Sequence, residues 1–481
     1  MFLGIDLGTS SIKVVLLDNE EKLIDSASVP LTIQHPQPGF SEQNPQEWWQ
    51  ALQHAMQQLK QRQSILLQQV KAIGFSGQMH GATLLDEHGD ILRPCILWND
   101  GRSIEECRWL EQQADFIGIT GNRVMAGFTA PKLLWVQRHE PDIFAKTAHI
   151  LLPKDYLRYR MSGDFASDMS DSAGTLWLDT ARRCWSEELL VACNLTQNQM
   201  PTLYEGHQIT GILYDSLADS WGLSRGTPLV AGAGDNAASA IGLGVIKAGD
   251  GFVSLGTSGV IFVAADQHYA NPAQAVHSFC HALPDRWHQM TVTLSAAASL
   301  SWFASITATL EAELAQEAEQ HEAGSVLFAP YLSGERTPWN NPNLRGAFLG
   351  LASDSGRGNL ARAVLEGVAF SLADGYRALQ QAGCAPHQMI ATGGGARSKF
   401  WLQMIADLTA CRIVVPSYAD VGAAFGAARL ARLAVEPDAL QHLASHTLAT
   451  TAIIRPQPQP ALQERYQRYQ QYTRMLCQQE A

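Results

Sequence analysis

The sequence predicts an α/β protein built from two related lobes, and three observations carry this prediction. Short β-prone runs alternate with segments of helical periodicity, as in proteins whose helices cover sheets. The string Leu-Gly-Thr-Ser occurs at 7–10 and again at 255–258, each time after a β-prone run. At 481 residues the chain is longer than one hydrophobic core usually organises. We therefore expect two structurally related lobes, 1–245 and 246–481.

The first lobe is predicted to open with two strands joined by a tight turn. Residues 2–5 and 12–17 are β-prone, and a glycine between them supplies the bend. A helix is expected at about 45–60, since an Asn-Pro pair begins it and apolar residues recur at helical spacing. β-prone runs at 70–75 and 228–231 continue the alternation of strands and helices.

The second lobe repeats this opening at 253–259 and then carries a long helix near 359–382, which has apolar residues on one face. Proline-rich residues 456–460 predict an extended spacer. A last helix is expected after the spacer, with an apolar stripe that docks it. This stripe consists of Leu462, Tyr466, Tyr469 and Leu476.

Composition argues against several classes of function. Thirty-four basic and 46 acidic side chains leave a formal charge of -12, which repels nucleic acid and anionic lipid. The eight cysteines form no Cys-x-x-Cys pair, which disfavours a zinc site or a disulfide framework. No run reaches the roughly 18 apolar residues of a membrane span, and no signal-like stretch precedes Asp6. We expect a cytoplasmic protein that binds neither nucleic acid nor membranes.

Three glycine-rich turns are candidate phosphate-binding elements, at 6–11, 254–259 and 392–398. Glycine lets backbone N–H groups approach an anion, and Thr and Ser hydroxyls add donors. Neither a P-loop string nor a dinucleotide fingerprint occurs, so these turns are expected to hold ATP in another way, and three ordinary tight turns are the alternative. The candidate ATP-binding residues are Thr9, Ser10, Gly256, Thr257, Gly394, Gly395 and Ser398.

Two carboxylates, Asp6 and Asp235, are candidate catalytic residues and candidate ligands of Mg²⁺. Asp6 ends the first predicted strand directly before a glycine turn, where a hard oxygen ligand suits Mg²⁺. Asp235 lies among small residues that leave room for a ligand, in a stretch where a carboxylate is costly to bury. Phosphoryl transfer needs one group that accepts the proton of the attacking hydroxyl, and Asp235 fits that role. A helix cap is the alternative role for Asp235.

Two further segments predict a polar pocket for a sugar. Gly-Gln-Met-His-Gly at 77–81 presents Met79 and His80 after a predicted strand. Trp98 and Asp100 add an aromatic face and a hydrogen-bonding group. A lone histidine is more often structural than functional, but the flanking glycines favour a functional role for His80.

Several long strings in this chain resemble the FGGY family of carbohydrate kinases, and within it most closely the xylulokinases. Two strings are similar to the family signatures, one is similar to a further family segment, and the Gly-Gln-Met-His-Gly string suggests the xylulokinase subgroup. The first signature is matched by 127–139, and the second by 346–351 together with 359–366. The further family segment is 331–338, and the subgroup string is 77–81. The resemblance spans nearly the whole chain, from Asp6 to about Arg429.

The resemblance implies a two-lobed actin-like, ribonuclease H-like ATPase fold with a deep cleft between the lobes. It implies that ATP phosphorylates D-xylulose to D-xylulose 5-phosphate, with Asp235 as the proton acceptor and Asp6 linked to Mg²⁺. The residues expected to contact the sugar are Met79, His80, Asp235 and Asn236. Those expected near the nucleotide are Thr257, Gly394 and Ser398. Sugar binding is expected to close the lobes, because closure excludes water.

Two alternatives stay open. The first is a kinase for another ketose or polyol, such as ribulose, fuculose, L-xylulose or glycerol, because a single sequence does not rank close stereoisomers. The second is an actin-like ATPase switch, although a switch needs no sugar pocket. A homodimer is expected from the family resemblance alone.

Overall fold

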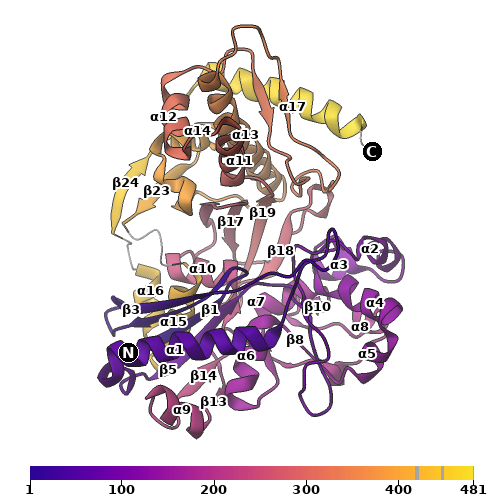
Figure 1. Cartoon of the computed structure of the whole chain (residues 1–481), viewed down its shortest axis with the longest axis vertical. Helices are drawn as coiled ribbons and strands as arrows, with labels where there is room; N and C mark the ends of the chain where they lie inside the picture. The colour runs from indigo at the N-terminus through magenta and orange to yellow at the C-terminus, as the bar shows by residue number, and fades with distance from the viewer. Residues whose placement is uncertain (418–421, 446–448, 480–481) are drawn as a thin grey trace.

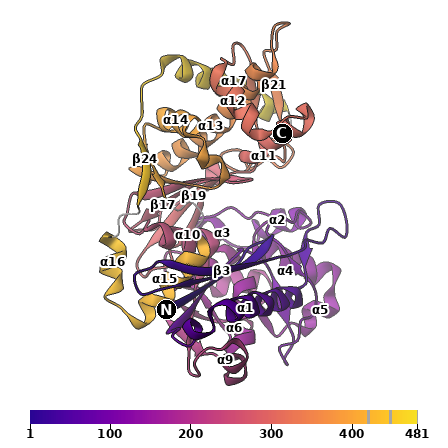
Figure 2. The same ribbon diagram turned by 60° about the vertical axis from the view of Figure 1, so that its left-hand side comes forward.

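The structure is a computed structural model that describes residues 1–417, 422–445 and 449–479. Two lobes, each built around a large sheet, lie one above the other in Figure 1, and Figure 2 shows the same division from another side. The indigo-to-magenta first half of the chain forms the lower lobe, and most of the second half forms the upper lobe. The predicted two-lobed α/β fold is confirmed.

The sheet of the lower lobe has the strand order β13-β14-β5-β1-β2-β3, and β15 also pairs with β5. Strands β1, β5 and β14 are parallel to one another. The bounds are β1 Phe2–Leu7, β2 Ser11–Leu17, β3 Leu23–Pro30, β5 Ala72–Gly77, β13 Ile209–Ile212, β14 Pro228–Val230 and β15 Ala233–Gly234.

The sheet of the upper lobe has the order β18-β19-β17-β16-β22-β23-β24. Here β16, β22 and β23 are the parallel strands. The bounds are β16 Asp250–Leu255, β17 Gly259–Ala265, β18 His277–Cys280, β19 Trp287–Thr293, β22 Gln388–Thr392, β23 Arg412–Pro416 and β24 Thr450–Ile454.

The two sheets repeat one arrangement of six strands. The series β3, β2, β1, β5, β14, β13 in the first sheet matches β19, β17, β16, β22, β23, β24 in the second. Directions agree as well: the three central strands are parallel in each series, and the strands outside them are antiparallel to their neighbours. The repeated Leu-Gly-Thr-Ser string therefore marks a structural duplication, as predicted.

The long predicted helices are present. Helix α1 (Pro45–Leu67) extends beyond the predicted end near 60, because its last turn buries Leu67. Helix α13 (Arg357–Gln381) matches the prediction near 359–382. Helix α17 begins at Pro460, the last residue of the predicted spacer, and runs to Gln479. Its docking stripe is confirmed, since Leu462, Tyr466 and Tyr469 are buried and Leu476 is partly buried.

Helix α15 (Ala423–Val435) belongs to the second half of the chain but packs on the sheet of the lower lobe. Glycines allow this close approach: a Cβ on Gly4 of β1 would lie 1.9 Å from the Ala424 carbonyl oxygen, and one on Gly74 of β5 equally close to that of Ala427. Helix α15 also crosses α10 (Asp235–Leu243), which links the two lobes.

The remaining elements surround the two sheets. The other helices are α2 Ile104–Leu110, α3 Phe116–Thr120, α4 Thr129–His139, α5 Pro141–Lys146, α6 Pro153–Ser162, α7 Met169–Ser172, α8 Glu187–Ala192, α9 Asp215–Trp221, α11 Ala297–Thr307, α12 Glu311–Gln320, α14 Lys399–Thr409 and α16 Ala439–Ser445. Short strands are β4 Glu42–Gln43, β6 Thr83–Leu85, β7 Cys95–Ile96, β8 His149–Leu151, β9 Ala166–Asp168, β10 Leu178–Asp179, β11 Cys184–Trp185, β12 Thr202–Tyr204, β20 Leu327–Ala329 and β21 Ala347–Leu349. Within the described ranges, no helix combines the length and apolarity needed to cross a membrane.

Candidate active site

Asp6 and Asp235 lie on either side of strand β5, at the carboxyl ends of parallel strands. Asp6 of β1 is opposite Ser76 of β5, and Ala233 of β15 is opposite the same Ser76 from the other side. Asp235 follows directly after β15, and the segment with Met79 and His80 follows directly after β5. Because the carboxyl ends of parallel strands meet at one sheet edge, these three segments converge.

The carboxylate of Asp235 is held at one oxygen and open at the other. Its Oδ1 accepts hydrogen bonds from the Asn236 backbone N–H at 2.7 Å and from Asn236 Nδ2 at 2.9 Å. Among the described residues, Oδ2 has no hydrogen-bond partner. Burial, and then the charge of Asp6, raise the pKa of Asp235 to about 6. Gly234 is the N-cap of α10, and no side chain caps this helix. The alternative role of Asp235 as a helix cap is therefore wrong.

Asp6 has an oxygen that suits a metal ion. Its Oδ1 is buried, and the described part of the chain offers it no hydrogen-bond partner. Burial raises the pKa of Asp6 to about 6, an effect that Ser76 and Lys13 partly offset. No group of three or more potential ligand side chains occurs among the described residues. A cation beside Asp6 would therefore need water or phosphate oxygens to complete its coordination, which is how Mg²⁺ is usually bound.

His80 is held as a neutral imidazole. Its backbone has a positive φ of 71°, which is uncommon for a non-glycine residue and is often found at functional sites. Burial, with Lys132 nearby, lowers the pKa of His80 to about 3. Nδ1 lies 2.8 Å from the Gly174 carbonyl oxygen, which can only accept, so Nδ1 carries the proton. Nε2 is then a hydrogen-bond acceptor.

Met79 and Trp98 tie the predicted sugar loop to the predicted phosphate turn. A Cβ on Gly234 would lie 2.9 Å from Met79 Cγ, so the Met79 side chain packs against the residue before Asp235. Trp98 Nε1 donates to Thr9 Oγ1 at 3.0 Å, and Thr9 Oγ1 donates to Gln78 Oε1 at 2.9 Å. The turn that includes Thr9 is thereby joined to the segment of Met79 and His80, and the next residue, Ser10, is exposed.

Asp100 is engaged inside the protein. Its Oδ2 accepts from the Ser41 backbone N–H at 2.5 Å, and both of its oxygens accept from Arg102. The residue is only 3% exposed. These contacts account for Asp100 as a structural group, and they give no support to the predicted contact with a sugar.

Arg336 lies in the family-like string 331–338 but was not among the candidate site residues predicted from the sequence. Its Nη2 lies 3.4 Å from the position of a Cβ on Gly127, so the guanidinium reaches the lower lobe from a loop of the upper lobe. Thr337 anchors that loop by donating to the carbonyls of Val292 and Ala275. Within the described ranges, the guanidinium has no ion-pair or hydrogen-bond partner. The family-like string 331–338 was the available signal.

The structure brings the other two glycine turns together at the edge of the upper sheet. Ser254 of β16 is opposite Thr392 of β22. A Cβ on Gly395 would lie 2.9 Å from Leu255 Cβ, so the two turns are in contact. By contrast, a Cβ on Gly394 would meet nothing within 4 Å.

The remaining candidates in these two turns differ in exposure. A Cβ on Gly256 would meet only the Ser258 carbonyl oxygen, at 3.6 Å. The Thr257 side chain is exposed, and its carbonyl accepts from the Ala296 N–H at 2.9 Å. Ser398 caps helix α14 by accepting from the Trp401 N–H at 3.2 Å. Gly256 and Gly394 thus border open space, and Ser398 lies at a helix N-terminus, as an anion-binding site requires.

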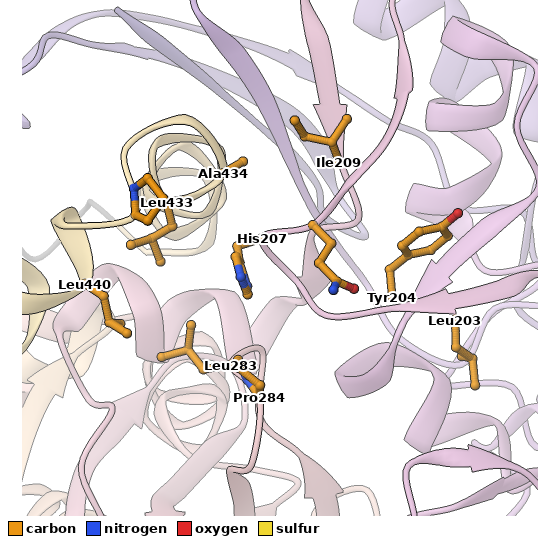
Figure 3. A pocket seen from close by; sticks show the side chains of 11 residues that line it. Leu203, Tyr204, His207, Ile209, Leu283, Pro284, Leu433, Ala434 and Leu440 are labelled. Carbon is orange, nitrogen blue, oxygen red and sulfur yellow. The ribbon is translucent and has the colours of Figure 1, made fainter.

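A separate cavity of about 680 Å³ lies away from these residues (Figure 3). Its lining comes from the segment before and into β13, the loop after β18, and the ends of α15 and α16. In Figure 3, Leu283, Leu433 and Leu440 lie on one side of His207, and Tyr204 lies on the other side. None of the predicted site residues lines this cavity.

A duplicated α/β architecture with a carboxylate pair at one sheet edge and glycine turns at the other is that of the two-domain actin-like ATPases. The model for the N-terminal domain of the FGGY family of carbohydrate kinases matches residues 1–242, and the model for the C-terminal domain matches residues 251–435. The chain belongs to the FGGY family of carbohydrate kinases.

Named relatives agree with this assignment. The chain is 52% identical to a xylulose kinase of Escherichia coli strain K12 and 50% identical to one of Klebsiella pneumoniae, each over 91% of both chains. A crystal structure titled as a xyloylose kinase from Brucella ovis is 47% identical, with a TM-score of 0.95 over 99% of both chains.

Proposed function

We propose that this protein catalyses the ATP-dependent phosphorylation of D-xylulose to D-xylulose 5-phosphate, with Asp235 as the general base. The observation that carries the proposal is the open Oδ2 of Asp235, on a carboxylate whose pKa is raised to about 6, beside Asp6 at one sheet edge. The choice of D-xylulose as the substrate rests on the xylulose kinases of two bacteria, each at least half identical to this protein over most of the chain.

Asp235 performs the proton transfer in this proposal. The C5 hydroxyl oxygen of the ketose forms a bond to the γ-phosphorus of ATP, and the bond from that phosphorus to the β–γ bridging oxygen breaks. The hydroxyl proton passes to Asp235 Oδ2, and ADP leaves. A carboxylate with a raised pKa is a stronger base than an ordinary aspartate, and Asn236 orients it through Oδ1.

Two sets of residues position the nucleotide. Gly256 and Gly394 border open space at the upper sheet edge, where backbone N–H groups can approach phosphates or the nucleoside. Asp6 would hold Mg²⁺ through its unpartnered Oδ1, and the second carboxylate, Asp235, lies across β5. When bound, Mg²⁺ neutralises the charge on the transferring phosphate.

The sugar would lie over the carboxyl ends of β5 and β15. His80 Nε2 accepts a hydrogen bond from a sugar hydroxyl, while Trp98 and Met79 give apolar faces. The unpaired guanidinium of Arg336 donates to sugar oxygens from the opposite lobe. The Arg336 residue is partly buried, and a ligand that accepts its hydrogen bonds replaces the water that a partly buried cation loses.

One assay separates this function from its alternatives. ADP release is measured with ATP, Mg²⁺ and a panel of ketoses and polyols, for the wild type and for Asp235→Ala. D-xylulose should stimulate release most strongly, and the variant should lose that stimulation. A stronger response to ribulose, fuculose, L-xylulose or glycerol would reassign the substrate. ADP release that no sugar alters would favour a nucleotide switch. Sedimentation of the same preparation tests the expected homodimer.

A further inference from the structure

A buried cluster of charges lies directly beneath the proposed catalytic edge. Lys154 Nζ is 2.7 Å from a carboxylate oxygen of Asp155, 2.8 Å from Asp168 and 3.2 Å from Asp171. All four side chains are at most 1% exposed. A second cation, Arg158, lies 3.6 Å from Asp155. Buried ion pairs are weak contributors to stability because desolvation offsets their attraction, so this cluster calls for another explanation.

The cluster contains more acids than bases. Two cations face three carboxylates, so one acid must be neutral to avoid a buried net charge. Burial raises the pKa of Asp171 well above its usual value, and Lys154 offsets only part of this effect. Asp168 Oδ2 accepts hydrogen bonds from Ser170 Oγ and from the Ser170 and Asp171 backbone N–H groups.

A chain of hydrogen bonds runs from this cluster to the residue before Asp235. Asp168 Oδ2 accepts from Ser170 Oγ at 2.5 Å, and Ser170 Oγ accepts from the Gly234 backbone N–H at 3.1 Å. Ser170, Asp168 and Lys154 are all buried. The Ala233–Gly234 peptide, one residue before Asp235, is thus bonded to Ser170, whose hydroxyl is held by the carboxylate of Asp168, which in turn pairs with the ammonium of Lys154.

Helix capping explains only part of this arrangement. Asp168 is the N-cap of α7 and accepts from the Ser170 and Asp171 backbone N–H groups. A cap does not require the Ser170 hydroxyl to reach Gly234, which lies in strand β15. On the other side, Met79 packs against Gly234. The Gly234 peptide is therefore fixed both by Ser170 and by a residue of the predicted sugar loop.

We propose that Ser170, held by Asp168 and Lys154, is a positioning residue that fixes the Ala233–Gly234 peptide, one residue before Asp235, and so aims the Asp235 carboxylate at the acceptor hydroxyl. This role rests on the proposed function of Asp235. It matters because a displacement of about 1 Å at a reacting group can cost about 100-fold in rate. In this proposal the Ser170 hydroxyl acts through its hydrogen bond to the Gly234 N–H.

Ser172 provides a matched control. It lies in the same short helix and is equally buried, and its Oγ bonds to Ser167 Oγ at 2.9 Å. It makes no hydrogen bond to β15. Ser170→Ala and Ser172→Ala each remove one buried hydroxyl, so both should lower the thermal midpoint by similar amounts. Only Ser170→Ala removes the contact with the Gly234 peptide.

The test combines kinetics with crystal structures of both variants. Ser170→Ala should lower kcat about 10- to 100-fold with KM for the ketose changed less than about threefold, whereas Ser172→Ala should keep kcat within about twofold. The crystal structure of Ser170→Ala should show Asp235 displaced or in several rotamers, and that of Ser172→Ala should not. Wild-type kcat in Ser170→Ala, or an equal loss of kcat in both variants, overturns the proposal.

The structural arm separates this proposal from the proposed function. If the wild type phosphorylates no ketose, the proposed function fails, and the position of Asp235 in the Ser170→Ala crystal still decides whether Ser170 fixes it. An Asp235 that stays in place in that crystal overturns the positioning role whatever the activity.

Discussion

The negative charge of Asp6 acts on Asp235 across strand β5. Asp6 is opposite Ser76, and the residue before Asp235 is opposite Gly77, so a single strand separates the two acids. Burial is the larger cause of the raised pKa of Asp235, and Asp6 adds to it. One carboxylate free for a cation and another free for a proton are the two charged groups that phosphoryl transfer asks of this lobe.

Replacing the proposed base should abolish most activity. Asp235→Asn keeps the size and the contact with Asn236 but removes the proton acceptor, so kcat should fall by about 10²- to 10⁴-fold. Steady-state ADP release with saturating ketose measures this. Asp215→Asn makes the same change at the first residue of α9, where Asp215 is exposed beside Arg225, and it should leave kcat unaltered. An Asp235→Asn enzyme with near wild-type kcat would contradict the assignment.

The same variant should be more stable than the wild type, in a pH-dependent way. In the folded protein the pKa of Asp235 is about 6, above its usual value of 3.8, so folding favours the protonated form. The wild type therefore loses stability, relative to Asp235→Asn, as pH rises from about 4 through 6. The difference in thermal midpoint between the two proteins should be small at pH 4 and level off above pH 7. A difference in thermal midpoint that does not depend on pH would show that burial does not raise the pKa of Asp235.

His80 should serve the sugar and not the nucleotide. His80→Leu removes the Nε2 acceptor, so KM for the ketose should rise about 10-fold, the worth of one hydrogen bond in a buried site, while KM for ATP stays constant. Because the pKa of His80 is lowered to about 3, this effect should be the same from pH 6 to 8. His88→Leu, at a side chain 74% exposed, is the control. A rise in KM for ATP alone would move His80 out of the sugar pocket.

Gly394 and its neighbour Gly393 should respond differently to a larger side chain. Gly394→Val places atoms in open space, so the fold should persist while KM for ATP rises by about 10-fold or more, from lost contact with the nucleotide. Gly393 has a φ of 87° and its Cβ would lie 2.7 Å from Leu255, so Gly393→Val should lower the thermal midpoint. Unchanged KM for ATP in Gly394→Val would place the nucleotide elsewhere.

Arg336 should bind the sugar from the opposite lobe. A hydrogen bond from a charged donor is worth about 1.5–3 kcal/mol, so Arg336→Met should raise KM for the ketose by about 10- to 100-fold. Arg345→Met in the same loop region is the control, because Arg345 donates to the carbonyls of Pro342 and Leu344. Equal KM values for the two variants would remove Arg336 from the sugar pocket.

The carboxylate pair and the duplicated turns could be read from the sequence because each depends on local residue chemistry. Asp6 and the string at 255–258 follow β-prone runs, and strands place such residues at a sheet edge. Asp100 shows the limit of this reasoning. An aspartate can hydrogen-bond a sugar hydroxyl, but both oxygens of Asp100 accept hydrogen bonds from within the protein, from Arg102 and Ser41. Ser41 is distant in the sequence, and the fold brings it next to Asp100.

Contacts between distant segments lay beyond the sequence for the same reason. Helix α15 was not predicted from the sequence, and it covers the sheet of the first lobe although it belongs to the second half of the chain. A hydrogen bond joins Ser170 and Gly234, which are 64 positions apart in the chain. Neither residue type predicts that the two are in contact. Periodicity and local motifs carry no information about such pairings.

The identity of the product tests the central claim most directly. The wild-type enzyme is incubated with ATP, Mg²⁺ and D-xylulose, and the product is examined by phosphorus and proton NMR. We expect one new phosphate monoester coupled to the C5 protons of xylulose, formed in equal amount to ADP, and no such product with Asp235→Ala. Inorganic phosphate in place of a sugar phosphate, or a sugar phosphate still formed at the wild-type rate by Asp235→Ala, would contradict the account.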